Sequence, residues 1–207
     1  MAQQLLARYG VVTRESVAAE WIPGGFSAIY DVLKALEEAG RIHRGYFASG
    51  VGAAQFALPA ALEQLRALRD DPEHPEVVHL AASDPANPYG AILKWPELDV
   101  GAGRGPSRSV GAIVILVNGA CAAYVARGGR MLAVYLPDDE PQRSLVARAV
   151  SDELAVLALS GHHRGLLVTE INGQPAGAHP LAPYLVESGF AASALGFTVI
   201  RRTVAPA

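Results

Sequence analysis

The chain has 207 residues, which is enough for one large domain or two small ones. Apolar residues make up 51% and charged residues 18%, so the composition excludes the polar, charge-rich class of disordered chains. The net charge of −3 excludes attraction of nucleic acid by the surface as a whole, and any phosphate-binding surface must be a local basic patch.

The beginning of the chain predicts two short helices. Residues 3–9 have helical spacing, and Thr13 with Ser16 is suited to cap a second helix over residues 15–21. The apolar face of this second helix includes Trp21.

A tight turn and a third helix follow. Pro23-Gly24-Gly25 favours a turn. Apolar residues then recur at helical spacing up to Gly40, which suits a helix end; they are Phe26, Ile29, Val32, Leu33 and Leu36. Two helices joined by a short turn predict a helix-turn-helix.

A hairpin after the third helix decides which kind of helix-turn-helix is predicted. Residues 41–47 and 53–58 have strand patterns, and a glycine-rich loop at 50–52 joins them. A further helix begins after Pro59. The sequence therefore predicts an N-terminal winged helix over residues 1–70, ending at a linker rich in proline and acidic residues.

The remaining residues, 71–207, predict an α+β domain. An amphipathic helix containing residues 145–157 ends at Gly161. A short helix is expected over residues 180–188, and strands over 77–82, 111–117, 120–126, 131–136, 165–171 and 195–202. Closely spaced hairpin turns between three of these strands favour a β-barrel-like antiparallel domain with a packed helix.

Several classes of protein are excluded or disfavoured by motifs. A lone cysteine, Cys121, excludes an internal disulfide and fits a reducing cytoplasm, and the longest apolar run is too short to span a bilayer. The glycine-rich segment 101–105 lacks the Lys-Ser/Thr ending of a phosphate-binding loop, and His162-His163 lacks helical chelating spacing. We expect a cytoplasmic chain without a membrane partner, metal or cofactor of its own.

A basic surface is expected on the hairpin. No acidic residue occurs between Glu38 and Glu63. Within this interval the residues suited to contact phosphates or stack on bases are Arg41, His43, Arg44, Tyr46 and Phe47. The third helix offers Lys34 beside three acidic residues, which disfavours phosphate binding there. The alternative role for the hairpin is packing against protein.

The turn-rich segment 84–90 allows two interpretations. Asp84 and Asn87 are suited to cap backbone amides in an Asx-type turn. The functional alternative makes Asp84 a general base that activates water, which requires a cleft around it.

Five segments together resemble the extreme C-terminal region of bacterial large helicase-related proteins. They are Pro23-Gly24-Gly25-Phe26, the run 33–41, Arg44-Gly45-Tyr46-Phe47, Gln55-Phe56-Ala57 and the run 84–90. The resemblance implies a superfamily 2, ATP-dependent DNA helicase of DNA repair, with tandem winged helices and a β-barrel-like domain. ATP and Mg²⁺ would belong to its motor domains, which would be partners of this chain together with the other winged helices.

That C-terminal region is itself similar to AlkZ-type DNA glycosylases. Gln55-Phe56-Ala57 matches their Gln-apolar-Gln/Asp motif in part, with alanine at the third position, so Gln55 joins Asp84 as a weak catalytic candidate. Three hypotheses follow. The leading one is an accessory module that engages single-stranded or forked DNA through the wing; the others are a base-excision fragment and a homo-oligomerisation module using the apolar strands at 111–136.

Overall fold

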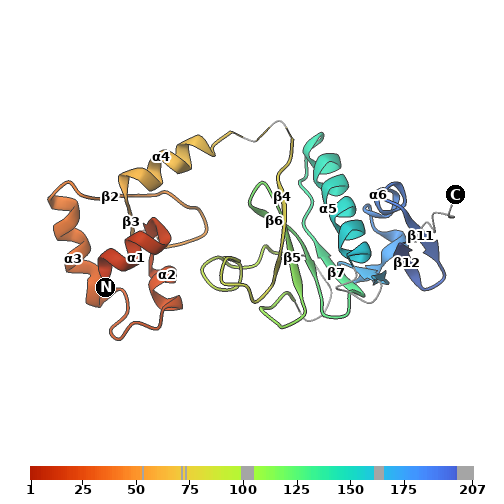
Figure 1. Ribbon diagram of the computed structural model, residues 1–207, viewed down its shortest axis with the longest axis horizontal. Helices are drawn as coiled ribbons and strands as arrows, with labels where there is room; N and C mark the ends of the chain where they lie inside the picture. Colours follow the sequence, from red (N-terminus) through yellow and green to blue (C-terminus); the bar gives the residue numbers. More distant parts are fainter. Residues whose placement is uncertain (53, 71, 73, 99–104, 161–165, 200–207) are drawn as a thin grey trace, which may run out of the picture. The chain divides into compact units, whose positions relative to one another are not determined.

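The computed structural model describes residues 1–52, 54–70, 72, 74–98, 105–160 and 166–199 (Figure 1). The chain divides into two compact units, Met1–Asp71 with Pro88–Lys94, and Pro72–Asn87 with Trp95–Ala207. The His162-His163 pair and residues 101–104 of the glycine-rich segment lie outside the described residues.

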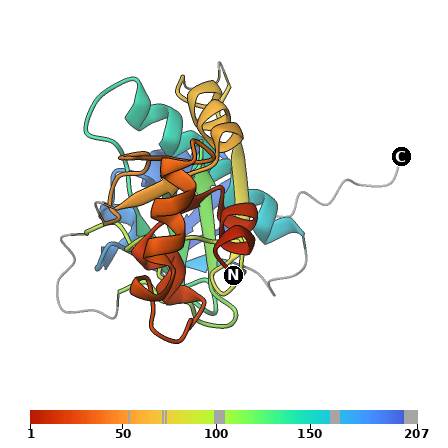
Figure 2. The same ribbon diagram turned by 90° about the vertical axis from the view of Figure 1, so that its left-hand side faces the viewer.

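The first unit contains the predicted winged helix (red to orange in Figure 2). Its elements are α1 (Ala2–Tyr9), β1 (Val11–Val12), α2 (Arg14–Ala19), α3 (Ser27–Glu38), β2 (His43–Gly45), β3 (Gln55–Ala57) and α4 (Pro59–Ala67). The three strands form an antiparallel sheet in the order β1-β3-β2. This element order is that of a winged helix, and β1, which was not predicted, completes its sheet.

The start of α2 is fixed by a reciprocal cap. The N–H of Ser16 donates to the Thr13 side chain at 3.1 Å, and the N–H of Thr13 donates to the Ser16 hydroxyl at 2.9 Å, as the sequence predicted. The predicted end of this helix was wrong. Trp21 lies beyond α2 in a left-handed conformation, with φ at 52°, and is 91% exposed.

The core of the first unit is built around β3. Phe56 is fully buried, and its ring centroid lies 6.4 Å from that of Phe26 and 6.0 Å from that of Tyr30. Buried residues from the three N-terminal helices complete this cluster, among them Leu6, Val17, Ile29 and Leu33. The wing is thereby anchored to α3 by aromatic packing.

The second unit is α+β. Its elements are β4 (Val77–Ala81), β5 (Ile113–Val117), β6 (Ala120–Val125), β7 (Met131–Val134), α5 (Gln142–Leu159), β8 (Leu167–Val168), β9 (Glu170–Ile171), β10 (Gln174–Pro175), a 3-10 helix (Ala176–Ala178), α6 (Ala182–Glu187), β11 (Phe190–Ser193) and β12 (Gly196–Val199). Strands β5 to β7 form the predicted antiparallel meander, and β4, which was predicted as a separate strand, extends it by pairing antiparallel with β5.

The predicted barrel-like closure is not found among the described residues. The large sheet is open, with the order β10-β9-β7-β6-β5-β4, and a second sheet has the order β11-β12-β8. Residues 165–171 were predicted as one strand. The described part of this segment divides at Thr169, so that β8 pairs with β12 while β9 runs parallel to β7. β5 and β6 are largely buried, and the exposed residues of the meander lie mainly on edge strand β4.

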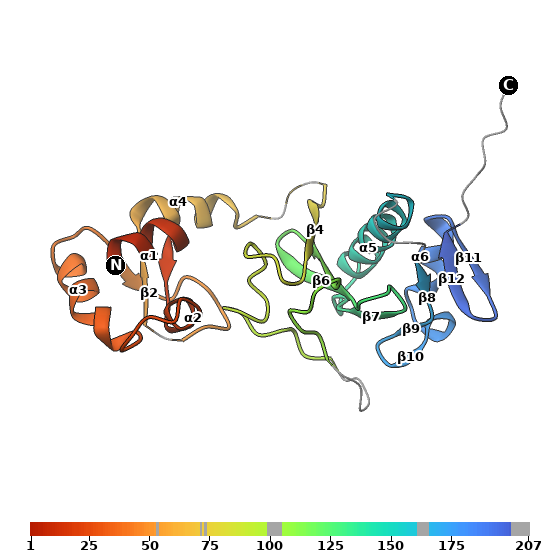
Figure 3. The same cartoon turned by 60° about the horizontal axis from the view of Figure 1, so that its bottom comes forward.

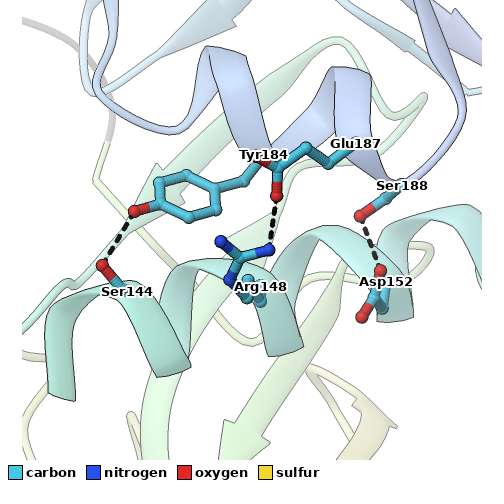
Figure 4. Close-up of polar contacts among 6 residues, drawn as sticks. All are labelled: Ser144, Arg148, Asp152, Tyr184, Glu187 and Ser188. Atoms are coloured by element: carbon cyan, nitrogen blue, oxygen red, sulfur yellow. Dashed lines mark hydrogen bonds and ion pairs between the residues drawn. The ribbon is translucent and has the colours of Figure 1, made fainter. Parts of the chain in front are cut away.

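Helix α5 covers one face of the large sheet (Figure 3). Its buried residues, including Val150 and Leu154, join Ile115 and Val134 in the core of this unit. The side chains of Ser144, Arg148 and Asp152 follow one another at one-turn intervals along α5. They contact, respectively, Tyr184 and Glu187 of α6 and Ser188 directly after it (Figure 4). No helix among the described residues is long and apolar enough to cross a membrane.

Candidate nucleic-acid interface

The hairpin presents most of the predicted DNA-binding residues to solvent. Arg41, His43 and Arg44 are exposed, and Tyr46 is 81% exposed. Phe47 is half-buried and its ring lies against Gly45. None of the three basic side chains has an ion pair within the described part of the chain. The hairpin therefore offers uncompensated positive charge beside an exposed aromatic ring.

Helix α3 has a different charge pattern. Lys34 is exposed, but its ammonium group lies 3.6 Å from the Glu38 carboxylate one turn later. Asp31 is also exposed on this helix. The acidic character expected from the sequence is therefore present at the surface, and Lys34 is partly neutralised.

Gln55 lies inside the wing. It is fully buried, and its Oε1 accepts hydrogen bonds from the N–H groups of Phe47 at 2.8 Å and Ala48 at 2.9 Å. Its Nε2 donates to the carbonyl oxygens of Ala48 at 2.8 Å and Gly52 at 3.2 Å. The amide thus uses both acceptor sites and both donors to hold the backbone of the loop between β2 and β3.

A second side chain ties the same loop to α2. The N–H of Gly52 donates to Oε1 of Glu15 at 3.0 Å. Because Glu15 lies in the first turn of α2, this bond fixes the wing loop beside the beginning of that helix.

Two arginines pack on the aromatic cluster at this end of the unit. The guanidinium carbon of Arg14 lies 5.7 Å from the ring centroid of Phe26, and that of Arg44 lies 5.9 Å from the ring centroid of Phe56. Arg44 was predicted from the sequence, whereas Arg14 was missed. The signal that the sequence offered for Arg14 was its position directly after the Thr13 cap, where it is the first residue of α2.

Asp84 belongs to the second unit and forms the Asx-type turn. Its Oδ1 accepts a hydrogen bond from the N–H of Ala86 at 2.8 Å, and the side chain of the buried Asn87 donates to the carbonyl of Ala82 at 2.9 Å. Arg108, which the sequence reasoning missed, donates to the carbonyls of Asp84 and Asn87. The interpretation of Asp84 as a turn-forming residue accounts for these contacts.

The second unit contains a pocket of about 570 Å³ beyond the end of β7. His179 lines it, with Nδ1 accepting from the N–H of Leu181 at 3.1 Å and Nε2 3.3 Å from the Asn172 amide. Burial lowers the pKa of His179 from its ordinary value. Arg143 and Glu97 also line the pocket, whereas neither Asp84 nor Gln55 does.

The fold and the basic hairpin define a winged-helix protein with an additional α+β unit. Residues 1–77 match the family model described as "Large helicase-related protein, winged-helix domain". This match confirms the resemblance of the winged helix to the large helicase-related family.

Two relatives extend the match beyond the winged helix. "Lhr helicase/probable uracil glycosylase" from Mycolicibacterium smegmatis is 47% identical over 176 residues, or 83% of this chain and 11% of the relative. "Lhr helicase/uracil glycosylase" from Escherichia coli is 35% identical over 199 residues, or 95% of this chain and 12% of the relative. The chain thus spans about a ninth of the length of these relatives.

Proposed function

We propose that this chain is a DNA-binding accessory module of a repair helicase, engaging single-stranded or forked DNA through its wing. The observation that carries the proposal is the exposure of Arg41, His43 and Arg44 on one hairpin without an ion pair among the described residues. Such groups favour phosphate contacts, since each contact releases condensed counterions. Tyr46 adds an exposed ring suited to base stacking.

The proposal places ATP hydrolysis elsewhere. The two relatives are named as helicases, and ATP and Mg²⁺ would act in motor domains of the same polypeptide. The contribution of this chain is then to hold DNA for the motor and to pack against neighbouring winged helices.

Fluorescence anisotropy with labelled single-stranded, duplex and forked DNA tests the proposal. We expect binding that weakens steeply with salt and is abolished in the Arg41→Ala, Arg44→Ala double variant. A control, Arg8→Ala, removes a charge that is already paired with Glu20 and is expected to bind like the wild type. Equal affinity of the double variant and wild type would contradict the role of the wing.

A second candidate is a role in base excision, because both relatives carry uracil glycosylase in their names. The candidate residues are Asp84 and Gln55, although their side chains are engaged in a turn and in the wing. Incubation with uracil-containing oligonucleotides followed by alkali tests this directly. Strand cleavage lost in Asp84→Asn would support it, and intact oligonucleotide with the wild type would remove it.

A further inference from the structure

We propose that Arg14 and Arg44 together form a binding site for the backbone phosphates of nucleic acid, where α2, α3 and the wing meet. This inference rests on the proposed DNA-binding function and deepens it. It adds Arg14, which lies outside the hairpin, and it names the ligand as phosphodiester groups.

The two arginines share one aromatic support. Phe26, at the beginning of α3, and Phe56, on β3, have ring centroids 6.4 Å apart, and Tyr30 contacts both rings. Arg14 packs on the first ring from α2, and Arg44 packs on the second from β2. Rings from two other elements therefore hold the two guanidinium groups close to the same cluster.

Stacking prepares a guanidinium group for an anion. An aromatic ring contacts its face and leaves the N–H groups at its edge available, and these form a planar fork that matches two oxygens of a phosphate. The ring also restricts the long side chain before the ligand arrives, which lowers the entropy lost on binding. Both arginines are exposed, so the edges of their guanidinium groups are accessible to solvent.

The two guanidinium groups of this site are not engaged in ion pairs. Neither Arg14 nor Arg44 has an ion pair within the residues that the structure describes. The nearest carboxylate in sequence, Glu15, accepts a hydrogen bond from Gly52 in the wing. The stem of Arg14 also lies beside Gly52, since a Cβ added at that glycine would be 3.9 Å from Arg14 Cδ. Wing and α2 thus form one continuous surface here.

Salt titration of DNA binding by the whole chain tests the site. In wild type, the logarithm of the affinity falls with the logarithm of salt concentration in proportion to the phosphates contacted. Removing two contacts in Arg14→Gln, Arg44→Gln should reduce this slope by about 1.8 on duplex and about 1.4 on single-stranded DNA. Arg14→Gln alone should reduce it by about half as much. Arg66→Gln, an exposed arginine of α4, is the charge-matched control and should keep the wild-type slope.

Footprinting of the wild-type chain tests the same site without any substitution. Labelling of arginine by p-hydroxyphenylglyoxal, read by mass spectrometry, should be reduced at Arg14 and Arg44 when DNA is present, but not at Arg66. Equal labelling of Arg14 with and without DNA would overturn the proposal. Protection by duplex alone, or by single strands alone, would identify the form of DNA that supplies the phosphates.

The outcomes separate this inference from the function on which it rests. If wild type does not bind DNA, both fail. If Arg41→Ala, Arg44→Ala abolishes binding while Arg14→Gln has the slope of the Arg66→Gln control, the wing function stands and the shared phosphate site is wrong.

Discussion

The side chain of Gln55 forms a two-way hydrogen-bonded pair with the backbone of Ala48. Oε1 accepts from the Ala48 N–H at 2.9 Å while Nε2 donates to the Ala48 carbonyl at 2.8 Å. The amide thereby imitates a strand partner for a loop that has no neighbouring strand. A residue first considered for catalysis accordingly has a structural position inside the wing.

Replacement of Gln55 by alanine should destabilise the fold. The change leaves the N–H groups of Phe47 and Ala48 without their acceptor in the loop between β2 and β3, and we expect a loss of about 2–4 kcal/mol in the free energy of unfolding. Urea denaturation measures this, and amide exchange at Phe47 and Ala48 should accelerate. Gln64→Ala, on the exposed side of α4, serves as the control. A Gln55→Ala variant as stable as this control would contradict the structural role.

Gly196 is expected to tolerate no side chain. Its φ is +133°, and a Cβ there would lie 2.1 Å from the carbonyl oxygen of Val168, a backbone atom of the neighbouring strand β8. Gly196→Ala should therefore separate β12 from β8 and cost about 3 kcal/mol or more. Gly177→Ala is the matched control, because nothing lies within 4 Å of its Cβ position. Thermal unfolding of the two variants side by side would distinguish them, and equal melting temperatures would refute the clash.

His179 should make stability depend on pH. Burial lowers its pKa in the folded chain below the ordinary value of about 6.5, so the unfolded chain takes up the proton first as pH falls. The stability that neutral His179 contributes is complete above about pH 6.5 and is lost as pH falls through the folded-state pKa. In His179→Asn this part of the pH dependence should disappear. Urea midpoints from pH 8 to pH 5 measure it, and parallel curves for both proteins would count against the mechanism.

Cys121 should be unreactive until the chain unfolds. Burial raises the pKa of its thiol to about 12, so little thiolate is present at pH 8. We expect alkylation by iodoacetamide to be on the order of 1000-fold slower in the native protein than in urea, where the ordinary pKa near 8.5 applies. Because the chain has one cysteine, a single mass shift reports the reaction. Rapid labelling of the native protein would show that the strand β6 opens readily.

Local signals predicted the winged helix well. The Thr13 and Ser16 cap, the spacing of apolar residues in α3 and the hairpin around the wing all involve residues close together in the sequence. The exposed basic hairpin residues were found in the same way, because a gap in acidic residues is visible in the sequence alone. Trp21 was misplaced because helical spacing does not reveal that the chain leaves α2 at Glu20.

The sequence by itself determined the helices, the hairpin turns, the meander from β5 to β7 and the resemblance to the large helicase-related family, since each depends on residues near one another or on a recognisable order of short segments. Only the tertiary structure decided that the large sheet stays open, that Gln55 closes the wing and that Arg14 and Arg44 pack on the neighbouring rings of Phe26 and Phe56. Those contacts join residues far apart in the chain, and their partners are fixed by packing and by loop closure, which local propensity does not specify.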